Sequence, residues 1–277
     1  LLIMIFLWKG IQQYTKDSEI QVLVLALFLC LQYFFSLNGI RQGVSMVLIF
    51  WGYQYCLQRK LLKYLLVVAV AVAFHYTAVV ALVLYWISKK IYSWSVYAVI
   101  FVAAFIIFKL NIILSLLSIL LSVLHVDGRY LSYISDVDSV NMTGLYMVGQ
   151  FMLFSISRLA ILKSKPEYKP ILNLWFLGIL GHFLFAFSLP ITRLTKYFEY
   201  FIILIMPYTI QYLNSIWKLQ IKDKIYNFKW GYIILLFYMV LFLNMISVIP
   251  HDYFSNWRNP YPSSMNIEYD FNFKIFE

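Results

Sequence analysis

The sequence predicts an all-α protein built as a polytopic bundle of transmembrane helices. Of its 277 residues, 63% are hydrophobic and only 12% are charged, and the mean hydropathy is +0.79. Apolar runs close to the ~20 residues that a helix needs to cross a bilayer recur along the whole chain. This composition excludes an ordinary soluble domain, because such a domain has no use for so much apolar surface.

The apolar runs divide the chain into candidate membrane segments. These are residues 20–37, 40–57, 61–87, 91–108, 143–162, 171–189, 197–213 and 231–250. The opening LLIMIFLW is too short to span and is interpreted as the end of a helix truncated at its N-terminus, which makes about 8–9 segments in all. We expect residues 1–250 to form one transmembrane domain and residues 251–277 to form a short tail on the outer side.

A shorter helix is expected at residues 111–125. Its polar residues recur at spacings of three and four, which places them in one narrow stripe: Asn111, Ser115, Ser118, Ser122 and His125. Such an amphipathic helix either lies in the membrane interface or faces a hydrated cavity.

Basic residues predict the orientation of the segments. Lysine-rich clusters occupy alternate connections, as the positive-inside rule requires of the cytoplasmic side: Lys9 and Lys16; Arg59, Lys60 and Lys63; Lys163, Lys165 and Lys169; Lys218, Lys222, Lys224 and Lys229. Lys89 and Lys90 do not fit if residues 61–87 cross once. Either the rule has a local exception, or this segment breaks near His75 and returns.

Arginines follow a different distribution from lysines. Four of them fall on the outer side or just beneath it: Arg41, Arg129, Arg193 and Arg258. The planar guanidinium binds phosphate oxygens bidentately, whereas an ammonium is a point charge. A phosphate-rich ligand at the outer leaflet would explain the distribution. The alternative is that these arginines pair with lipid headgroups or carboxylates.

The sequence offers little sign of a metal or cofactor. Cys30 and Cys56 both lie within apolar runs, and no P-loop, GxSxG, HExxH or Cys/His cluster occurs. Asp136 and Asp138 form a DxD pair, but they lie in an outer loop between serines, which favours a solvated turn. We therefore expect no metal and no cofactor. The net charge of +10 is explained by loop lysines, so no nucleic acid partner is expected.

Four short motifs occur in order along the chain. They are Ile40-Arg41-Gln42-Gly43, then Phe74-His75-Tyr76-Thr77-Ala78, then Arg193 with Tyr197 and Phe198, and finally Asn259-Pro260-Tyr261. Together they resemble the EpsG branch of the Wzy-type polymerases of bacterial exopolysaccharide, capsule and O-antigen repeat units. Members of that family usually begin with further helices and an outer loop with Arg-Tyr and Asp-Tyr elements, which this sequence lacks.

The resemblance implies a GT-C-like glycosyltransferase of the bacterial cytoplasmic (inner) membrane, with its active site facing outward. It would transfer a growing polysaccharide from undecaprenyl diphosphate onto the sugar of an incoming lipid-linked oligosaccharide repeat unit. Membrane lipid, a flippase and a chain-length regulator are the implied partners. Arg41 and Arg193 would stabilise the leaving diphosphate, with Arg258 as a weaker candidate, and Gln42 and Tyr197 would bind substrate. Arg129 beside Tyr130 would replace part of the missing outer loop.

The proton acceptor for the attacking hydroxyl is His75 or Glu199, and each has a structural alternative. His75 as a neutral imidazole would fix helix packing through Tyr76, Thr77 or a backbone carbonyl. Glu199 would pair with Lys196 or Arg193 and orient the arginine. An ionisable residue within a membrane segment is expensive, which is why both remain functional candidates.

Other functions stay open at this point. A ligase or acyltransferase is the nearest alternative, but a ligase typically has one large outer loop, and the longest outer connection here is 125–142. A flippase of lipid-linked sugars would be expected to show internal repeats and helices broken by Gly or Pro near the midplane. A scaffold subunit would not need the outer arginines.

Overall fold

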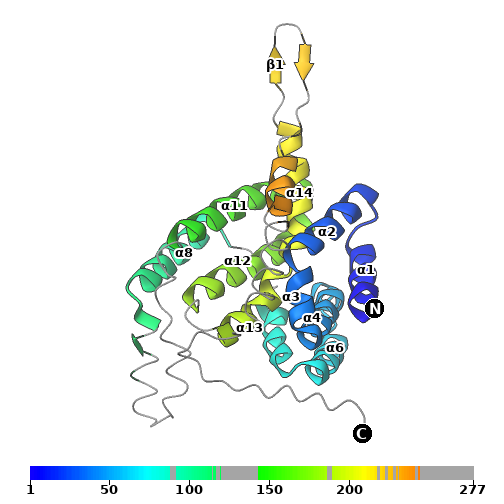
Figure 1. Ribbon diagram of the computed structural model, residues 1–277, viewed down its shortest axis with the longest axis vertical. Coiled ribbons are helices and arrows are strands. Elements are labelled where there is room, and N and C mark those ends of the chain that lie inside the picture. The colour runs from blue at the N-terminus through cyan, green and yellow to red at the C-terminus, as the bar shows by residue number, and fades with distance from the viewer. Residues whose placement is uncertain are drawn as a thin grey trace, which may run out of the picture.

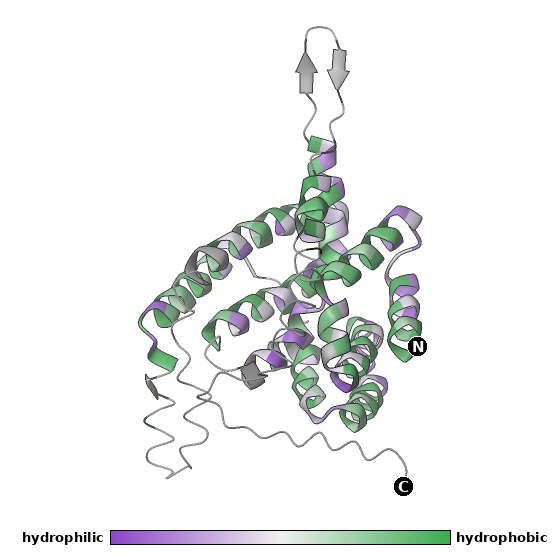
Figure 2. Cartoon of the chain, viewed as in Figure 1, coloured by the Kyte–Doolittle hydropathy of each residue, from purple (hydrophilic) through white to green (hydrophobic). Residues whose placement is uncertain are grey.

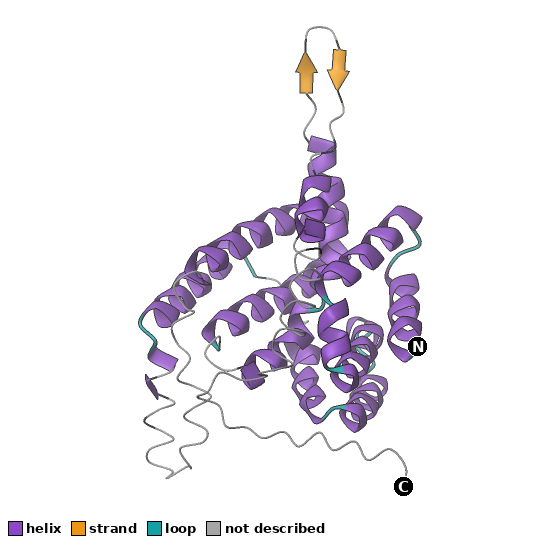
Figure 3. Cartoon of the chain, viewed as in Figure 1, coloured by secondary structure: helices purple, strands orange, loops and turns teal. Residues whose placement is uncertain are grey.

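The described residues are helical apart from turns and one small β-hairpin (Figures 1 and 3). The computed structural model describes residues 1–87, 92–113, 115–116, 119, 143–185, 189–216, 219–221, 224–226, 229, 231–240 and 243. The hairpin pairs β1 (Leu219–Ile221) with β2 (Lys224–Tyr226) in antiparallel register, with Leu219 opposite Tyr226. The predicted all-α class is therefore confirmed for the body of the protein, and the hairpin is an unpredicted addition.

The helices follow one another closely along the chain. They are α1 (Leu2–Tyr14), α2 (Ser18–Leu31), α3 (Tyr33–Asn38), α4 (Ile40–Gly52), α5 (Gln54–Leu57), α6 (Leu61–Phe74), the 3-10 helix η1 (Tyr76–Val83), α7 (Leu84–Ile87), α8 (Trp94–Lys109), α11 (Thr143–Ser164), the 3-10 helix η3 (Pro166–Tyr168), α12 (Lys169–Leu184), α13 (Leu189–Glu199) and α14 (Ile202–Ile216). Residues 232–240 form a further helical stretch. Within the described ranges, no helix combines the length and the hydropathy that a membrane span requires.

Helices α4 and α12 lie at the centre of the fold because they are apolar around most of their circumference. Helix α4 packs between α1 and α6, and α12 packs against α11 and α13. Phe50 of α4 and Trp175 of α12 are both almost completely buried. These central helices hold the elements that form the two polar regions described below.

The outer helices also carry apolar side chains on their exposed sides. Leu62 of α6 is 73% exposed and Val99 of α8 is 69% exposed. Hydrophobic residues occupy most of the length of these helices (Figure 2). Contiguous exposed apolar surface marks a face that contacts another apolar phase or another protein.

The predicted segment 61–87 breaks at His75 and returns. Helix α6 ends at Phe74, His75 has an extended backbone (φ −150°, ψ 117°), and η1 then runs back along α6. Near the other end of this pair, the Tyr64 hydroxyl donates to the carbonyl of Ala81 at 2.6 Å. A single crossing of residues 61–87 is therefore wrong, and the alternative of a return is confirmed. The His75 side chain accepts a hydrogen bond from the Thr77 amide, so it caps the returning helix.

The predicted segment 197–213 is also divided. Helix α13 ends at Glu199 and α14 begins at Ile202, so the expected outer connection around Arg193 is in fact helical. The rings of Tyr200 and Phe201 pack on Phe50 of α4, at centroid distances of 5.4 and 5.9 Å. These aromatic contacts fix the turn, and apolar periodicity could not indicate it because both turn residues are themselves hydrophobic. The predicted segments 20–37 and 40–57 are likewise each split into two helices.

The lysine-rich connections lie at one end of the bundle, and Arg41 and Arg193 lie at the opposite end. At the lysine-rich end, the hydroxyl of Tyr168, next to Lys169, donates to the carbonyl of Tyr14, near Lys16. At the other end, Arg41 contacts Phe74 and Gln42 contacts Arg193. The Arg59 guanidinium lies over the ring of Tyr85 in α7, 6.0 Å from its centroid. Since Arg59 belongs to a lysine-rich connection, α7 ends on the lysine-rich side. Lys89 and Lys90, most of residues 111–125 and the tail 251–277 lie outside the described residues, and the division into a domain and a tail stays a prediction.

The packing of η1 against α6 predicts that loss of the hydrogen bond between Tyr64 and Ala81 destabilises the protein. Tyr64→Phe should lower the free energy of unfolding by about 1–2 kcal/mol, because the Ala81 carbonyl loses its buried donor. Thermal unfolding of the purified protein measures this change. Tyr76→Phe is the control, since Tyr76 is 77% exposed, and it should leave the melting temperature unchanged. Equal effects of the two variants would contradict the packed return.

Candidate functional site

Three elements from distant parts of the sequence meet at the end of the bundle opposite the lysine-rich connections. They are the first turns of α4, the tip of the α6–η1 return, and α13, which lies beside them (Figure 1). The meeting brings together five residues that the sequence singled out: Arg41, Gln42, His75, Arg193 and Tyr197. This is the candidate active site.

A side-chain amide joins α4 to α13. Gln42 is only 2% exposed, and its Nε2 donates to the backbone carbonyl of Arg193 at 2.8 Å. The next residue, Gly43, allows α3 to pack closely against α4, because a Cβ there would lie 3.0 Å from the Cα and Cβ of Ser36 in α3. The glycine after Arg41-Gln42 therefore has a packing reason. Gln42 positions the backbone of Arg193, while its own side chain is withdrawn from solvent.

A hydrogen-bonded chain of side chains joins all three elements. The Ser45 Oγ and the Tyr197 hydroxyl lie 2.6 Å apart, and the Tyr197 hydroxyl lies 3.2 Å from Thr77 Oγ1. Thr77 Oγ1 in turn lies 2.8 Å from His75 Nδ1. Tyr197 is 1% exposed, so it acts as a buried brace between α4 and the tip of the return.

The environment of His75 defines what its ring can do. The backbone N–H of Thr77 donates to Nδ1 at 3.3 Å, so Nδ1 is an acceptor and the proton of the neutral imidazole lies on Nε2. A neutral imidazole in this tautomer donates a hydrogen bond through Nε2. The geometry thus suits donation to a substrate oxygen better than removal of a proton from one.

Two guanidinium groups flank His75. Arg41 Nε donates to the carbonyl of Phe74, the residue before His75, at 2.9 Å, and the backbone of Arg193 is bonded to Gln42, the residue after Arg41. Both arginines are exposed, and among the described residues neither forms an ion pair with a carboxylate. Helix α4 begins one residue before Arg41, so its N-terminal partial charge adds to the positive field. Such a cluster suits an anion with several oxygens.

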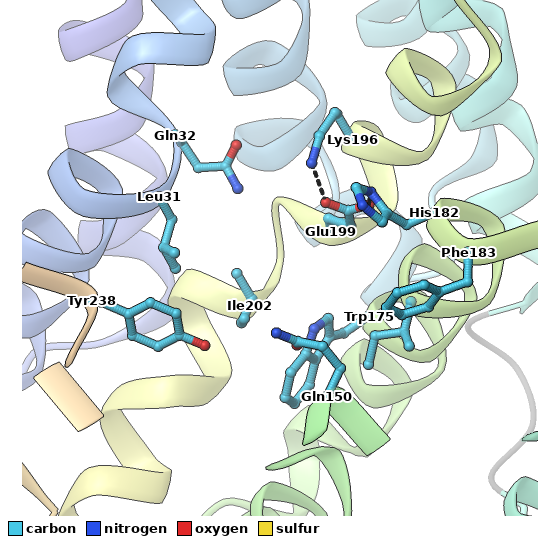
Figure 4. A pocket seen from close by; sticks show the side chains of 11 residues that line it. Leu31, Gln32, Gln150, Trp175, His182, Phe183, Lys196, Glu199, Ile202 and Tyr238 are labelled. Carbon is cyan, nitrogen blue, oxygen red and sulfur yellow. Dashed lines mark hydrogen bonds and ion pairs between the residues drawn. The ribbon is translucent and has the colours of Figure 1, made fainter. Parts of the chain in front are cut away.

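Glu199 is not part of this cluster. Its carboxylate lies 2.5 Å from Lys196 Nζ and 3.1 Å from His182 Nδ1, and it accepts a hydrogen bond from Thr195 Oγ1 at 2.9 Å. The predicted pairing with Lys196 is confirmed, and this pairing replaces the one with Arg193. Glu199 instead borders a separate pocket on another side of α13 (Figure 4).

The structure places two further groups in these polar regions that were not predicted from the sequence. Ser45 gave no signal, because a lone serine in an apolar run is common. His182 did give one, since it is an ionisable residue within the apolar run 171–189, the same feature that singled out His75. Arg129, Arg258, Asp136 and Asp138 lie outside the described residues. Among the residues that are described, no group of three or more His, Cys, Asp or Glu side chains is placed to hold a metal ion.

A model of the EpsG family matches residues 1–259 of the chain. The chain belongs to the EpsG family. The match covers the four motifs from which the resemblance was inferred, except for the last two residues of Asn259-Pro260-Tyr261. EpsG proteins are membrane polymerases of polysaccharide biosynthesis, so membership supports a polymerase-like role of the glycosyltransferase type. No curated protein and no solved structure matches the chain significantly.

The buried brace predicts energetic coupling between α4 and α13. Ser45→Ala and Tyr197→Phe should each destabilise the protein, and the double variant should lose less than the sum, with a coupling of about 0.5–1.5 kcal/mol. Unfolding free energies of the four proteins in the cycle give this value. Ser155→Ala is the matched control, because Ser155 bonds only within α11, and it should be additive with Tyr197→Phe. Additivity in both cycles would contradict the brace.

Proposed function

We propose that this EpsG protein polymerises lipid-linked oligosaccharide repeat units into a surface polysaccharide. The reaction would take place at the outer face of the bacterial cytoplasmic membrane. The hydroxyl oxygen of the acceptor sugar attacks the anomeric carbon of the growing chain, and the bond from that carbon to undecaprenyl diphosphate breaks. The lipid diphosphate leaves with the bonding electrons. A flippase and a chain-length regulator are the expected functional partners of the protein.

One observation supports this proposal above the others. Arg41 and Arg193 come from helices far apart in sequence, yet α4, α13 and the His75 turn are bonded together and both arginines are exposed without a carboxylate partner among the described residues. A leaving diphosphate develops negative charge as its bond to the sugar breaks, and preorganised donors stabilise that charge without reorganising. The Nε2–H of His75 supplies a further donor at the same place.

The membrane setting is supported by family membership and by the surface of the fold. EpsG proteins act in membranes, and α6 and α8 expose large apolar side chains such as Leu62 and Val99. The lysine-rich connections lie at the end away from the arginine cluster. By the positive-inside rule the lysine-rich end faces the cytoplasm, so the arginines face outward.

The proton of the acceptor hydroxyl needs a separate base. His75 Nδ1 is occupied by the Thr77 amide, so our candidate is the carboxylate of Glu199, which lies outside the arginine cluster against Lys196 and His182; the acceptor hydroxyl would have to approach it from the neighbouring pocket. Glu199 and Arg193 both belong to α13, so one helix would present the base and the diphosphate-binding group. Arg129 and Arg258 stay candidates for substrate binding in the outer loop and tail.

The proposal predicts loss of polymer when either arginine of the cluster is removed. Arg41→Ala and Arg193→Ala should each reduce long-chain polysaccharide about 100-fold or more, because removal of one charge-stabilising donor costs roughly that factor. Single repeat units should still be attached to their carrier. The measurement is a gel of surface polysaccharide from a deletion strain complemented with each variant.

Arg59→Ala is the control for this experiment. It removes the same charge at the lysine-rich end of the bundle, and it should give a normal ladder. Normal ladders from Arg41→Ala and Arg193→Ala at normal protein levels would contradict the proposed role. A deletion strain without any surface sugar would indicate a flippase or a ligase.

A further inference from the structure

A second polar region lies along the face of α13 next to the one that carries the buried brace. It is a pocket of about 190 Å³ bordered by residues of α2, α11, α12, α13, α14 and the stretch 232–240, together with Gln32 just after α2 (Figure 4). This volume is below the ~300–1,000 Å³ of pockets that enclose whole small-molecule ligands. It therefore suits a single ring and excludes an entire oligosaccharide.

The charged groups at the pocket largely cancel one another. Glu199 pairs with Lys196 at 2.5 Å and lies 3.1 Å from His182. The one carboxylate and the one ammonium cancel each other's charge. The arginine cluster, in contrast, presents two cations without an anion among the described residues. The pocket therefore suits a neutral ligand, whereas the arginine cluster suits an anion.

The side-chain amides of Gln32 and Gln150 can both donate and accept hydrogen bonds. Gln32 is 4% exposed and points into the pocket, and its Oε1 is buried without a hydrogen-bond partner in the described part of the chain (Figure 4). The Gln150 side chain also points inward. A buried polar atom without a partner is costly, so a ligand that supplied a donor to this amide would recover that cost.

Aromatic side chains form much of the remaining wall. Trp175, Phe183 and Tyr238 line the pocket beside the two amides. Aromatic faces pack against the C–H faces of sugar rings, while amides and carboxylates bond to the hydroxyl groups at the ring edge. The combination of one apolar face with donors and acceptors at the edge is the chemistry that recognises a sugar.

Helix α13 is a shared wall between the two regions. With 3.6 residues per turn, Arg193 and Tyr197 lie on one face, and Lys196 and Glu199 lie on a neighbouring face. Gln32 follows the end of α2, and His182 lies in the last turn of α12, so the pocket lies toward the same end of the bundle as the arginines.

We propose that this pocket binds one neutral sugar ring of the lipid-linked repeat unit. The inference rests on the proposed polymerase function and adds a sugar subsite to it. The arginine cluster then holds the diphosphate, and the pocket holds a ring through Gln32, Gln150 and the Glu199 carboxylate, within a wall that includes Trp175.

Binding measurements on the full chain in lipid nanodiscs test this assignment. The two probes are undecaprenyl diphosphate alone and the lipid-linked repeat unit extracted from the polymerase-deletion strain. Gln32→Leu should weaken binding of the repeat unit about 5- to 10-fold, the equivalent of one hydrogen bond, and should leave the affinity for undecaprenyl diphosphate unchanged. Arg41→Ala should weaken binding of both probes.

Stability and a matched control separate binding from folding. Gln32→Leu removes an unpartnered buried group, so its melting temperature should be equal to or above that of the parent. Gln21→Leu makes the same change at the other end of α2, where the amide bonds to the Thr15 carbonyl, and it should bind both probes normally.

The outcomes distinguish the two proposals. Normal repeat-unit binding by Gln32→Leu, together with weakened binding of both probes by Arg41→Ala, would overturn the sugar pocket and leave the polymerase proposal intact. Equal loss of both probes in Gln32→Leu would also overturn the pocket. Normal binding of both probes by Arg41→Ala, or no binding by the parent protein, would overturn the polymerase proposal and with it the pocket.

Discussion

The arrangement of the candidate site depends on the contact between α4 and α13. The Gln42 amide bonds to the Arg193 backbone, and the Ser45 and Tyr197 hydroxyls bond beside it, all of them buried or nearly so. Buried polar groups are stabilising only when they are paired, so these bonds specify one relative position of the two helices. That position fixes the backbones from which Arg41 and Arg193 extend. Two like charges then remain near each other because the scaffold beneath them is held by neutral bonds.

The return of the chain at His75 adds the third member of the site. A straight helix through residues 61–87 would carry His75 into the middle of the bundle. The break instead places it at a tip, where the Thr77 amide defines its tautomer and Tyr197 connects Thr77 to α4. The C-terminal end of α6 therefore lies at the candidate site. The same α13 that joins this brace also borders the neutral pocket, so one short helix separates a region suited to an anion from a region suited to a sugar ring.

Much of the site could be predicted from the sequence, and much of the topology could not. Arg41, Gln42, His75, Arg193 and Tyr197 were predictable because polar and ionisable residues within apolar runs are costly and form short motifs. The break at Tyr200 does not interrupt the apolar pattern, since side-chain packing causes it, whereas the break at His75 was one of two alternatives that Lys89 and Lys90 left open. The partner of Glu199 was within reach of the same reasoning, because His182 is also ionisable in an apolar run. The β-hairpin at 219–226 lies in a lysine-rich connection that charge alone assigned to a loop.

The central claim is that Arg41 and Arg193 together bind the lipid diphosphate. The most direct measurement is a cryo-electron microscopy structure of the full chain in a lipid nanodisc with undecaprenyl diphosphate added. Density for the diphosphate between the two guanidinium groups, within hydrogen-bond distance of both and beside His75 Nε2, is the result expected. Density for the diphosphate at the lysine-rich end, with the arginine cluster contacting only solvent or lipid headgroups, would contradict the claim.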